Sequence, residues 1–380
     1  MPPAERGVFF VTCAPGVEPV LHAEAKALRL AKLEQQVGGV RFEGTRADAW
    51  RANLWLRTAV RVLERLARFE ARDADALYEA TAEIPWERWL APGGSLAVQA
   101  QSSESALEHT QFLEQRVKDA VVDRFRARAG TRPAVDLVDP DLRIHLHLWR
   151  DRATLSLDTS GEALHKRGWR VHQGKAPLAE NLAAAMLLYS DWDRRAPLVD
   201  PFCGSGTIVI EAALLAAGIA MGARRAFGFE RWLDHDARSF SKLRAACSDS
   251  SAPKKRPILV GSDLDPERVA EARANAEHAG VGDWVRFEVA DARELALKRG
   301  WNASIVSNAP YGVRVGAREG SEIGQLYRTF GARLREQGKG CTLALLTLAN
   351  EHVEALGLRG LRRIALVNGG LECWLALGVV

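Results

Sequence analysis

A glycine-rich turn is the stretch of this sequence best suited to bind a ligand. An apolar pair leads into Asp200, and the turn continues Pro-Phe-Cys-Gly-Ser-Gly to Thr207, where an apolar helix pattern begins. Gly204 and Gly206 let backbone N–H groups come close to a ligand, beside a helix N-terminus that favours electron-rich groups. The pattern predicts a strand, a nucleotide-type cradle and a helix, although a tight connection without a ligand would have the same sequence.

The residues after this turn exclude two common nucleotide sites. A dinucleotide site needs a third glycine and an acidic residue about 20 residues further on, and a P-loop needs Gly-Lys-Ser/Thr; this sequence has neither. The next acidic residue at the end of an apolar run is Asp263, and Asp291 ends a third run. Strand ends that supply one contact each fit the adenosylmethionine version of the doubly wound fold.

Four motifs occur in the order found in class I methyltransferases that act on exocyclic nitrogens. They are Asp200-Pro-Phe-Cys-Gly-Ser-Gly-Thr207, Gly261-Ser-Asp-Leu-Asp-Pro266, Ala290-Asp-Ala292 and Asn308-Ala-Pro-Tyr-Gly312. The chain resembles the THUMP-containing RNA guanine-N2 methyltransferases, specifically the bacterial enzymes that modify 23S ribosomal RNA, over nearly all of its 380 residues. The resemblance implies S-adenosylmethionine as the cofactor and RNA as the partner.

The implied cofactor site lies at the carboxyl ends of the strands. Its candidate residues are Asp200, Phe202, Gly204, Ser205, Gly206, Thr207, Asp263, Leu264, Asp291, Ala292 and Asn308. Asp263 is suited to accept both ribose hydroxyls because an ionised carboxylate has two acceptor oxygens. Asp265 competes for this role, but it precedes a proline and is expected mainly to cap a helix. Asp291 could accept the adenine amine, cap a helix, or do both.

The candidate catalytic residues are Asn308, Ala309, Pro310 and Tyr311. An exocyclic aromatic amine is a poor nucleophile because its lone pair is delocalised into the ring. The Asn308 side-chain oxygen and the Ala309 carbonyl could accept its two hydrogens, while Tyr311 stacks on the flipped base. Positioning then suffices and no strong base is required. The family usually has Asn-Pro-Pro-Tyr, so Ala309 removes some rigidity; a plain proline turn is the alternative reading.

The expected fold class is α/β, with several domains. From Pro197 onward strands and helices alternate, which predicts a mostly parallel sheet, and Asn368-Gly-Gly370 predicts a hairpin at its end. The resemblance implies a Rossmann-like class I methyltransferase domain with seven strands, preceded by α+β ferredoxin-like and THUMP domains. The expected boundaries are 1–70 (ferredoxin-like), 71–160 (THUMP), 161–176 (linker) and 177–380 (methyltransferase).

The N-terminal part offers several candidate RNA contacts. Its expected strands are 8–13, 37–42, 95–101, 142–148 and 153–158, and its expected helices are 18–30, 47–69, 74–90 and 112–128. The helix at 47–69 would carry a stripe of arginines that could grip phosphates, namely Arg57, Arg61, Arg65 and Arg68. A solvated helix face would carry the same residues.

Two later segments are also candidate RNA contacts. The segment 160–176 interleaves Trp169 with basic residues and two histidines, a composition that can stack bases and meet phosphates; a solvated linker is equally consistent. An insertion at 218–255 contains Arg224, Arg225, Arg231 and Trp232, which could face RNA or belong to a surface helix pair.

Composition limits the remaining functions. Lys and Arg total 52 against 48 Asp and Glu, so the net charge of +4 gives no global positive field and a local patch must hold any nucleic acid. The five cysteines are scattered, and His145 and His147 have no third ligand in sight, so neither disulfides nor a metal site is expected.

No signal peptide or membrane-spanning run is recognised, so a soluble, cytoplasmic protein is expected. The oligomeric state stays open.

These observations favour a methyltransferase that forms N2-methylguanine in RNA, most simply in 23S ribosomal RNA. A tRNA guanine-N2 enzyme is the alternative within the same chemistry. Enzymes that methylate protein glutamine or DNA adenine use a similar tetrapeptide, but the expected N-terminal RNA module argues against both. A non-catalytic RNA-binding assembly factor is the alternative of another class, and Ala309 is its only support.

Overall fold

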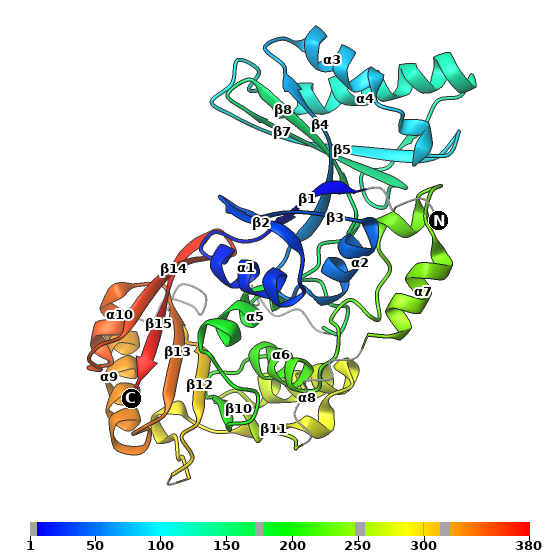
Figure 1. Cartoon of the computed structure of the whole chain (residues 1–380). Helices are drawn as coiled ribbons and strands as arrows, with labels where there is room; N and C mark the ends of the chain where they lie inside the picture. The colour runs from blue at the N-terminus through cyan, green and yellow to red at the C-terminus, as the bar shows by residue number, and fades with distance from the viewer. Residues whose placement is uncertain (1–5, 172–177, 248–254, 299, 312–319) are drawn as a thin grey trace. The chain divides into compact units, whose positions relative to one another are not determined.

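The chain divides into two compact units. The computed structural model describes residues 6–171, 178–247, 255–298, 300–311 and 320–380. Unit 1 comprises Met1–Thr12, Glu24–Leu164 and Arg224–Ala246, and unit 2 comprises Cys13–Ala23, His165–Ala223 and Cys247–Val380. Each unit contains one β-sheet (Figure 1). Residues 224–246 therefore cluster with the N-terminal unit and not with the residues that flank them in sequence.

Unit 1 is built on an eight-stranded sheet. Its order is β2 (Ala31–Gln36), β3 (Gly39–Gly44), β1 (Gly7–Thr12), β4 (Arg61–Glu70), β8 (Arg152–Asp158), β7 (Leu142–Trp149), β5 (Ser95–Ser103) and β6 (Ala134–Val135). Strand β4 pairs with β1 through residues 61–65 and with β8 through residues 63–70. This one strand therefore joins the N-terminal strands and the later strands into a single sheet.

One face of this sheet forms the core of unit 1. Paired residues of neighbouring strands share a face, and on this face they are apolar and buried: Phe9, Val11, Phe42, Val62, Ile144, Leu146, Leu155 and Leu157. The helices of the unit are α2 (Arg46–Trp55), α3 (Ala74–Glu83), α4 (Thr110–Ala129) and α7 (Ala237–Ala245), while α1 (Glu18–Ala27) crosses the division between the units. Helix α4 buries Leu113, Val117, Val121 and Phe125.

The helix expected at 47–69 is wrong. Helix α2 ends at Trp55, and residues 61–70 form strand β4. The apolar spacing fitted a helix, but strand β4 finds hydrogen-bond partners on both edges, in β1 and in β8. Long-range pairing of this kind overrides local periodicity. The helix expected at 74–90 is also shorter, because α3 ends at Glu83, just before Pro85.

Unit 2 contains the mostly parallel sheet that the sequence predicts, with the seven strands that the resemblance implies. Its order is β11 (Val285–Val289), β10 (Leu259–Asp263), β9 (Leu198–Asp200), β12 (Ser304–Asn308), β13 (Thr342–Thr347), β15 (Leu371–Val379) and β14 (Arg362–Asn368). Strands β9 to β13 are parallel, and β15 runs antiparallel to both β13 and β14. The expected C-terminal hairpin is confirmed.

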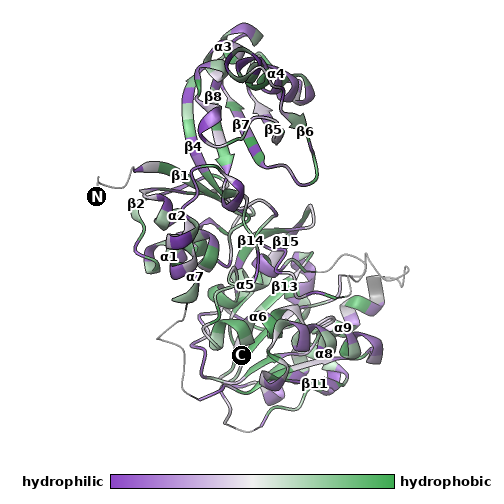
Figure 2. Ribbon diagram, turned by 90° about the vertical axis from the view of Figure 1, so that its right-hand side faces the viewer, coloured by the Kyte–Doolittle hydropathy of each residue, from purple (hydrophilic) through white to green (hydrophobic). Residues whose placement is uncertain are grey.

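The helices of unit 2 are α5 (Glu180–Tyr189), α6 (Thr207–Ala216), α8 (Pro266–Ala279), α9 (Gly320–Gln337) and α10 (Asn350–Ala355). Helices α5 and α6 are hydrophobic along most of their length (Figure 2) and nearly all their residues are buried. A helix that is apolar all round belongs in a core. These two helices therefore form the interior of unit 2 next to the glycine turn.

The segment expected as a linker is partly packed inside unit 2. Arg167 pairs with Glu211 at 3.2 Å, and both side chains are inaccessible to solvent. Arg170 pairs with Glu180 at 3.1 Å. Trp169 is only 5% exposed, so its ring is covered and the expected stacking on an RNA base is wrong for this residue. His172 and Lys175 of the same segment lie outside the described residues.

Residues 224–246 of the expected insertion are also explained by packing within unit 1. Arg231 donates to Asp139 at 2.6 Å, and Arg225 donates to the Ala163 carbonyl at 2.9 Å. Trp232 is 4% exposed. These side chains hold α7 and its preceding turn against the unit, which argues against the expected role as an RNA-facing surface.

Two expected absences concern the described residues only. None of the helices in the described part of the chain is long and apolar enough to cross a membrane. Within the same residues, no group of three or more His, Cys, Asp or Glu side chains could hold a metal ion. His145 instead lies 3.4 Å from the buried Asp158.

The buried pair of Arg167 and Glu211 yields a test of stability. Replacing Glu211 with alanine would leave the Arg167 guanidinium charged and buried, so we expect the free energy of unfolding to fall by about 3–5 kcal/mol. Urea unfolding of the full chain measures this change. The control is Glu336→Ala, which removes an exposed partner of Arg333 and should cost less than about 1 kcal/mol. Equal losses in the two variants would contradict the prediction.

Candidate active site

A cavity of about 1020 Å³ lies at the carboxyl ends of strands β9, β10, β11 and β12. Its described wall contains Pro201, Phe202, Gly204, Asp263, Leu264, Asp265, Arg268, Asp291, Ala292, Arg293, Asn308, Pro310, Glu322, Ile323, Gln325 and Leu326. Eight of the candidate cofactor-binding and catalytic residues are among them: Phe202, Gly204, Asp263, Leu264, Asp291, Ala292, Asn308 and Pro310. The structure therefore brings together four motifs that are far apart in sequence.

The sheet order explains this convergence. Strand β9 lies between β10 and β12 and is parallel to both. The chain leaves β9 toward β10 and later returns to the other side to form β12, and the strand order therefore reverses at β9. In doubly wound sheets, ligands bind in the crevice at such a switch point, beyond the carboxyl ends of the strands.

The glycine turn is shaped by two residues in the left-handed region. Gly204 has φ of +51° and open space where a side chain would begin, so its backbone faces the cavity. Gly206 has φ of +85°, and a Cβ atom there would lie 3.0 Å from Ala272 and from the Phe287 ring. Asn275 on α8, which is fully buried, donates to the Ser205 carbonyl at 3.0 Å and fixes the turn from below. No sequence motif marks Asn275.

Asp200 lies behind the cavity wall and not in it. Its side chain is buried and accepts hydrogen bonds from the Ser307 hydroxyl and from the Phe202 N–H at 3.2 Å. Burial raises the pKa of Asp200 to about 7, and these two hydrogen bonds only partly oppose the effect. The carboxyl group is therefore partly protonated near neutral pH. Ser307, which no sequence motif identified, connects Asp200 to the strand that carries Asn308.

Asp263 and Asp265 divide their roles in the structure. The Asp263 carboxylate accepts the N–H of Gly204 at 2.9 Å and that of Asp265 at 3.0 Å. It therefore ties the glycine turn to the end of β10 while it faces the cavity. Asp265 is the N-cap of α8 and accepts the Glu267 N–H at 2.8 Å, which confirms its expected capping role.

Asp291 is held by a residue that sequence reasoning missed. It caps the short helix at Ala292–Glu294 by accepting the Arg293 N–H at 2.9 Å. The Arg293 guanidinium also contacts both oxygens of the carboxylate, and these hydrogen bonds lower the pKa of Asp291. Asp291 is thus ionised and oriented along the cavity wall. A helix-start pattern gave the cap, but not the bidentate contact.

The tetrapeptide that begins at Asn308 follows β12 directly. The Tyr311 hydroxyl donates to the Asn308 side-chain oxygen. Ala309 is 2% exposed, and its N–H donates to the Leu346 carbonyl at 3.2 Å, which extends the pairing between β12 and β13. Gly312 lies outside the described residues.

A hydrogen-bonded group on α9, β13 and α10 supports the tetrapeptide from behind. The Tyr327 hydroxyl contacts the Pro310 carbonyl at 3.3 Å and the Thr347 hydroxyl at 2.9 Å, and Thr347 contacts His352 Nδ1 at 3.0 Å. The rings of Tyr327 and His352 are stacked with centroids 4.6 Å apart. Burial raises the pKa of Tyr327, so its hydroxyl keeps its proton. These residues are distant in sequence and no motif marks them.

Some expected site residues are not in the described wall. Ser205, Gly206 and Thr207 form the turn and the start of α6, and the Thr207 hydroxyl accepts a hydrogen bond from Arg170 at 3.2 Å. Ala309 lies in the core next to the wall. Helix α9 contributes Glu322, Ile323, Gln325 and Leu326 to the wall, although its sequence carries no motif.

The order of the seven strands and the cavity at the switch point define a class I methyltransferase fold. The chain belongs to the family described as the RMKL-like methyltransferase domain, which matches residues 167–376. The THUMP domain matches residues 71–158, and the RlmL ferredoxin-like domain matches residues 8–63. The expected fold class and family are confirmed. The division at 1–70, 71–160, 161–176 and 177–380 stays a prediction.

Named relatives extend this comparison. The chain is 43% identical over 375 residues to a ribosomal RNA large subunit methyltransferase K/L from Syntrophotalea carbinolica, and 41% identical over 379 residues to one from Pseudomonas paraeruginosa. The alignments cover 96% and 97% of this chain but 52% of each relative, so the chain spans about half the length of the curated relatives it matches. A solved structure of a protein complexed with SAH is 29% identical, with a TM-score of 0.88 over 99% of this chain and 98% of that chain.

The raised pKa of Asp200 gives a pH-dependent prediction. The unfolded chain loses this proton near the ordinary value of 3.8, whereas the folded chain keeps it until about pH 7. This group therefore stabilises the fold below pH 4, and its contribution is lost as the pH rises through 7. Between pH 5.5 and 8, wild type should lose about 2 kcal/mol relative to Asp200→Asn, which cannot ionise. Denaturant unfolding of both proteins at the two pH values measures this, and parallel curves would contradict it.

Proposed function

We propose that this chain transfers the methyl group of S-adenosylmethionine to the exocyclic N2 of a guanine in RNA, and that the RNA is 23S ribosomal RNA. The observation that carries the proposal is the position of Asn308 and Pro310 in the same cavity wall as Gly204, Asp263 and Asp291. Membership in a methyltransferase family and relatives named as ribosomal RNA large subunit methyltransferases support it. We propose a cytoplasmic location as well, because ribosomal RNA is found there.

The cavity wall fits the nucleoside end of the cofactor. An ionised carboxylate offers about four acceptor positions, and the N–H groups of Gly204 and Asp265 use two of those on Asp263. The others are available for the two ribose hydroxyls. Leu264 is 65% exposed although it is apolar, and together with Ile323 it offers apolar surface for the adenine ring. Asp291 is oriented by Arg293, which supports its proposed role as the acceptor of the adenine amine.

The reacting end is formed by Asn308 and its neighbours. When bound, S-adenosylmethionine supplies an electrophilic methyl group. The Asn308 side-chain oxygen and the Ala309 carbonyl accept the two hydrogens of the guanine amine, which turns the nitrogen lone pair toward the cavity. The Tyr311 hydroxyl now occupies the Asn308 oxygen, so it leaves that oxygen when the base enters and its ring stacks on the flipped base. The carbon–sulfur bond of the sulfonium would break as the nitrogen–carbon bond forms, and the nitrogen would lose one proton afterwards. The rate then depends on positioning and requires no strong base.

Nucleoside analysis of treated RNA tests the proposal. The full chain and S-adenosylmethionine are incubated with 23S ribosomal RNA and, separately, with tRNA, both from cells that lack the corresponding gene. We expect N2-methylguanosine in the ribosomal RNA with wild type. It should be lost with Asp263→Ala, which also loses cofactor binding, and with Asn308→Ala, which keeps cofactor binding.

Each other outcome rejects a stated part of the proposal. Methylation of tRNA alone would reject the ribosomal substrate. Methylation of adenine would reject guanine as the target base. Equal levels of methylguanosine with wild type and Asn308→Ala would reject the catalytic role of the tetrapeptide, and no methylation of either RNA with a wild type that binds the cofactor would favour a non-catalytic RNA-binding factor.

Tyr327 provides a separate prediction for the same site. Tyr327→Phe removes the hydroxyl that contacts the Pro310 carbonyl while the ring remains stacked on His352. The hydroxyl also contacts Thr347, but only its bond to Pro310 restrains the tetrapeptide. Loss of that bond, about 1.4 kcal/mol, should lower kcat about tenfold, whereas the KM for S-adenosylmethionine should not change. The matched control is Tyr78→Phe, which removes a hydroxyl bonded to Asp123 in unit 1. A changed KM with an unchanged kcat would contradict the positioning role.

A further inference from the structure

One face of the eight-stranded sheet in unit 1 carries polar side chains in two matching rows. Residues that pair across neighbouring strands point to the same face, so the strand register defines each row. The first row is Gln99, His145, Ser156 and Arg65, and the second is Gln101, His147, Thr154 and Arg68. Each row therefore places an amide, an imidazole, a hydroxyl and a guanidinium side by side across β5, β7, β8 and β4. We call these eight residues the two-row face.

The two-row face is opposite the buried face of the sheet and much of it is accessible. Arg68, His147, Gln99 and Gln101 are exposed. Arg65 is half-buried because its guanidinium lies 4.6 Å from the centre of the Phe10 ring. Antiparallel sheets often have one face in the core and one in water. Contact with water alone would require only that the residues of this face are polar. The face instead repeats the same four kinds of hydrogen-bonding group in both rows, which indicates a binding surface.

The charge of this face is not neutralised by nearby acids. None of the described acidic residues forms an ion pair with Arg65 or Arg68. Burial and the charges of Arg41 and Arg68 lower the pKa of Arg65, against an opposite effect of Glu34. Partial burial and the charges of Arg65 and Arg68 likewise lower the pKa of His147. The guanidinium groups are therefore close enough to repel one another, which an anionic partner would relieve.

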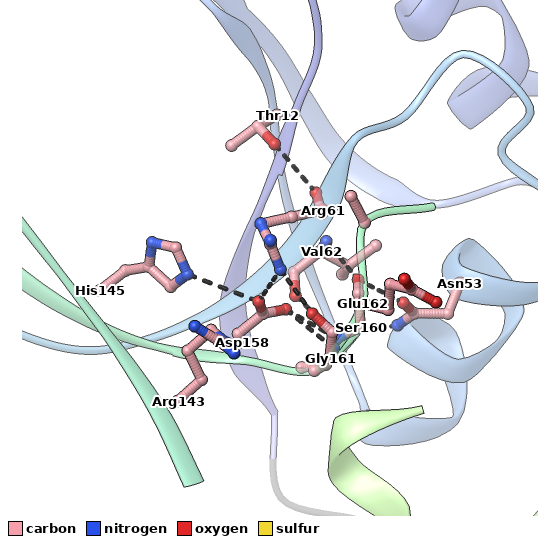
Figure 3. A network of polar contacts seen from close by, with 12 residues as sticks. Thr12, Asn53, Arg61, Val62, Arg143, His145, Asp158, Ser160, Gly161 and Glu162 are labelled. Carbon is pink, nitrogen blue, oxygen red and sulfur yellow. Dashed lines mark hydrogen bonds and ion pairs between the residues drawn. The ribbon is translucent and has the colours of Figure 1, made fainter. Parts of the chain in front are cut away.

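A buried carboxylate on the same face, that of Asp158, is already used within the sheet. Asp158 is buried and accepts contacts from Arg61 and from His145 Nε2, the latter at 3.4 Å (Figure 3). Although burial opposes it, the hydrogen bond from His145 and the charge of Arg61 hold the pKa of Asp158 below its usual value. The backbone N–H of Ser160 adds a further bond at 2.9 Å. This network fixes β4, β7 and β8 to one another, so the two rows are held in place before any partner binds.

We propose that the two-row face binds a single-stranded segment of the RNA substrate. The proposal rests on the proposed function for the identity of the partner. Arg65 and Arg68 contact phosphates. Neither forms an ion pair with a described acidic residue, and the hydrogen bond from Arg65 to the neutral Gln36 side chain, at 3.3 Å, leaves its charge uncompensated. Gln99, Gln101 and the imidazole of His147 offer donors and acceptors to the edges of unstacked bases. A flat sheet face suits splayed single strands, because the deep major groove of duplex RNA hides its base edges.

Binding of two RNA probes to the full chain tests this inference. The first probe is a fluorescein-labelled single-stranded RNA of mixed sequence, about 16 nucleotides long, which is the upper end of known single-strand site sizes. The second probe is the same strand annealed to its complement. Fluorescence anisotropy at several salt concentrations gives affinity and salt dependence. The variant carries Arg65→Gln and Arg68→Gln. The control carries Arg126→Gln and Arg128→Gln on α4, which removes the same charge from another part of unit 1.

We expect the Arg65/Arg68 variant to bind the single strand roughly tenfold more weakly or worse near 0.1 M salt. The slope of log affinity against log salt should decrease by about 1.4, which corresponds to about 0.7 for each lost phosphate contact on a single strand. The control should lose much less, and cofactor binding should not change in either variant. Wild type should prefer the single strand to the duplex.

The remaining outcomes overturn the inference or the proposed function separately. If wild type binds RNA and the Arg65/Arg68 variant matches it or the control, the two-row face is not the contact and the proposed function stands. A preference of wild type for the duplex rejects the single-stranded partner. Failure of wild type to bind either probe contradicts the proposed function itself. If the variant does not fold, Arg68→Gln with Gln101→Glu replaces it, since both side chains are exposed, and the same criteria apply.

Discussion

The parallel pairing of β9 with β10 on one side and β12 on the other is the constraint on which the candidate site depends. Parallel strands in one sheet end at the same edge, so Asp263 and Asn308 meet although they belong to motifs far apart in sequence. The glycine turn is fixed to this edge by a backbone bond from Cys203 to Ser262 at 2.9 Å and by the contact between Gly204 and Asp263. No motif forms the cavity alone.

Local chemistry explains which parts of the fold and the site could be predicted. Asp265 before Pro266 is a capping pattern, and the structure has that cap. The glycine turn and the strand ends follow from short patterns in the same way. The helix expected at 47–69 fails because its apolar spacing fits a helix as well as a strand, and only pairing with β1 and β8 decides between them. Boundaries set by distant partners cannot be read from a local period.

Apart from Arg293, which contacts Asp291 two positions away, the missed residues discussed above act through long-range contacts. Asn275 reaches the Ser205 carbonyl from α8, and Tyr327 reaches the Pro310 carbonyl from α9. The same holds for Arg170, which joins Glu180 to the Thr207 hydroxyl at the start of α6. Each is a polar side chain in an otherwise apolar or amphipathic segment, and such a residue needs a hydrogen-bond partner when buried. A polar residue in such a segment therefore predicts a specific hydrogen bond, but the sequence does not identify the partner residue.

Ala309 shows how a departure from a family pattern can be compensated. A proline at this position would have no N–H to donate, whereas the Ala309 N–H bonds to the Leu346 carbonyl and continues the pairing of β12 with β13. The rigidity lost with the proline ring is thus replaced by a strand bond, and the Tyr327 hydroxyl restrains the next carbonyl in the chain. Ala309 was the only sequence feature that favoured a non-catalytic protein, and this bond gives a local reason why the turn can hold its shape without the proline. The carbonyl of Ala309, which the proposed chemistry uses, is unchanged by the substitution.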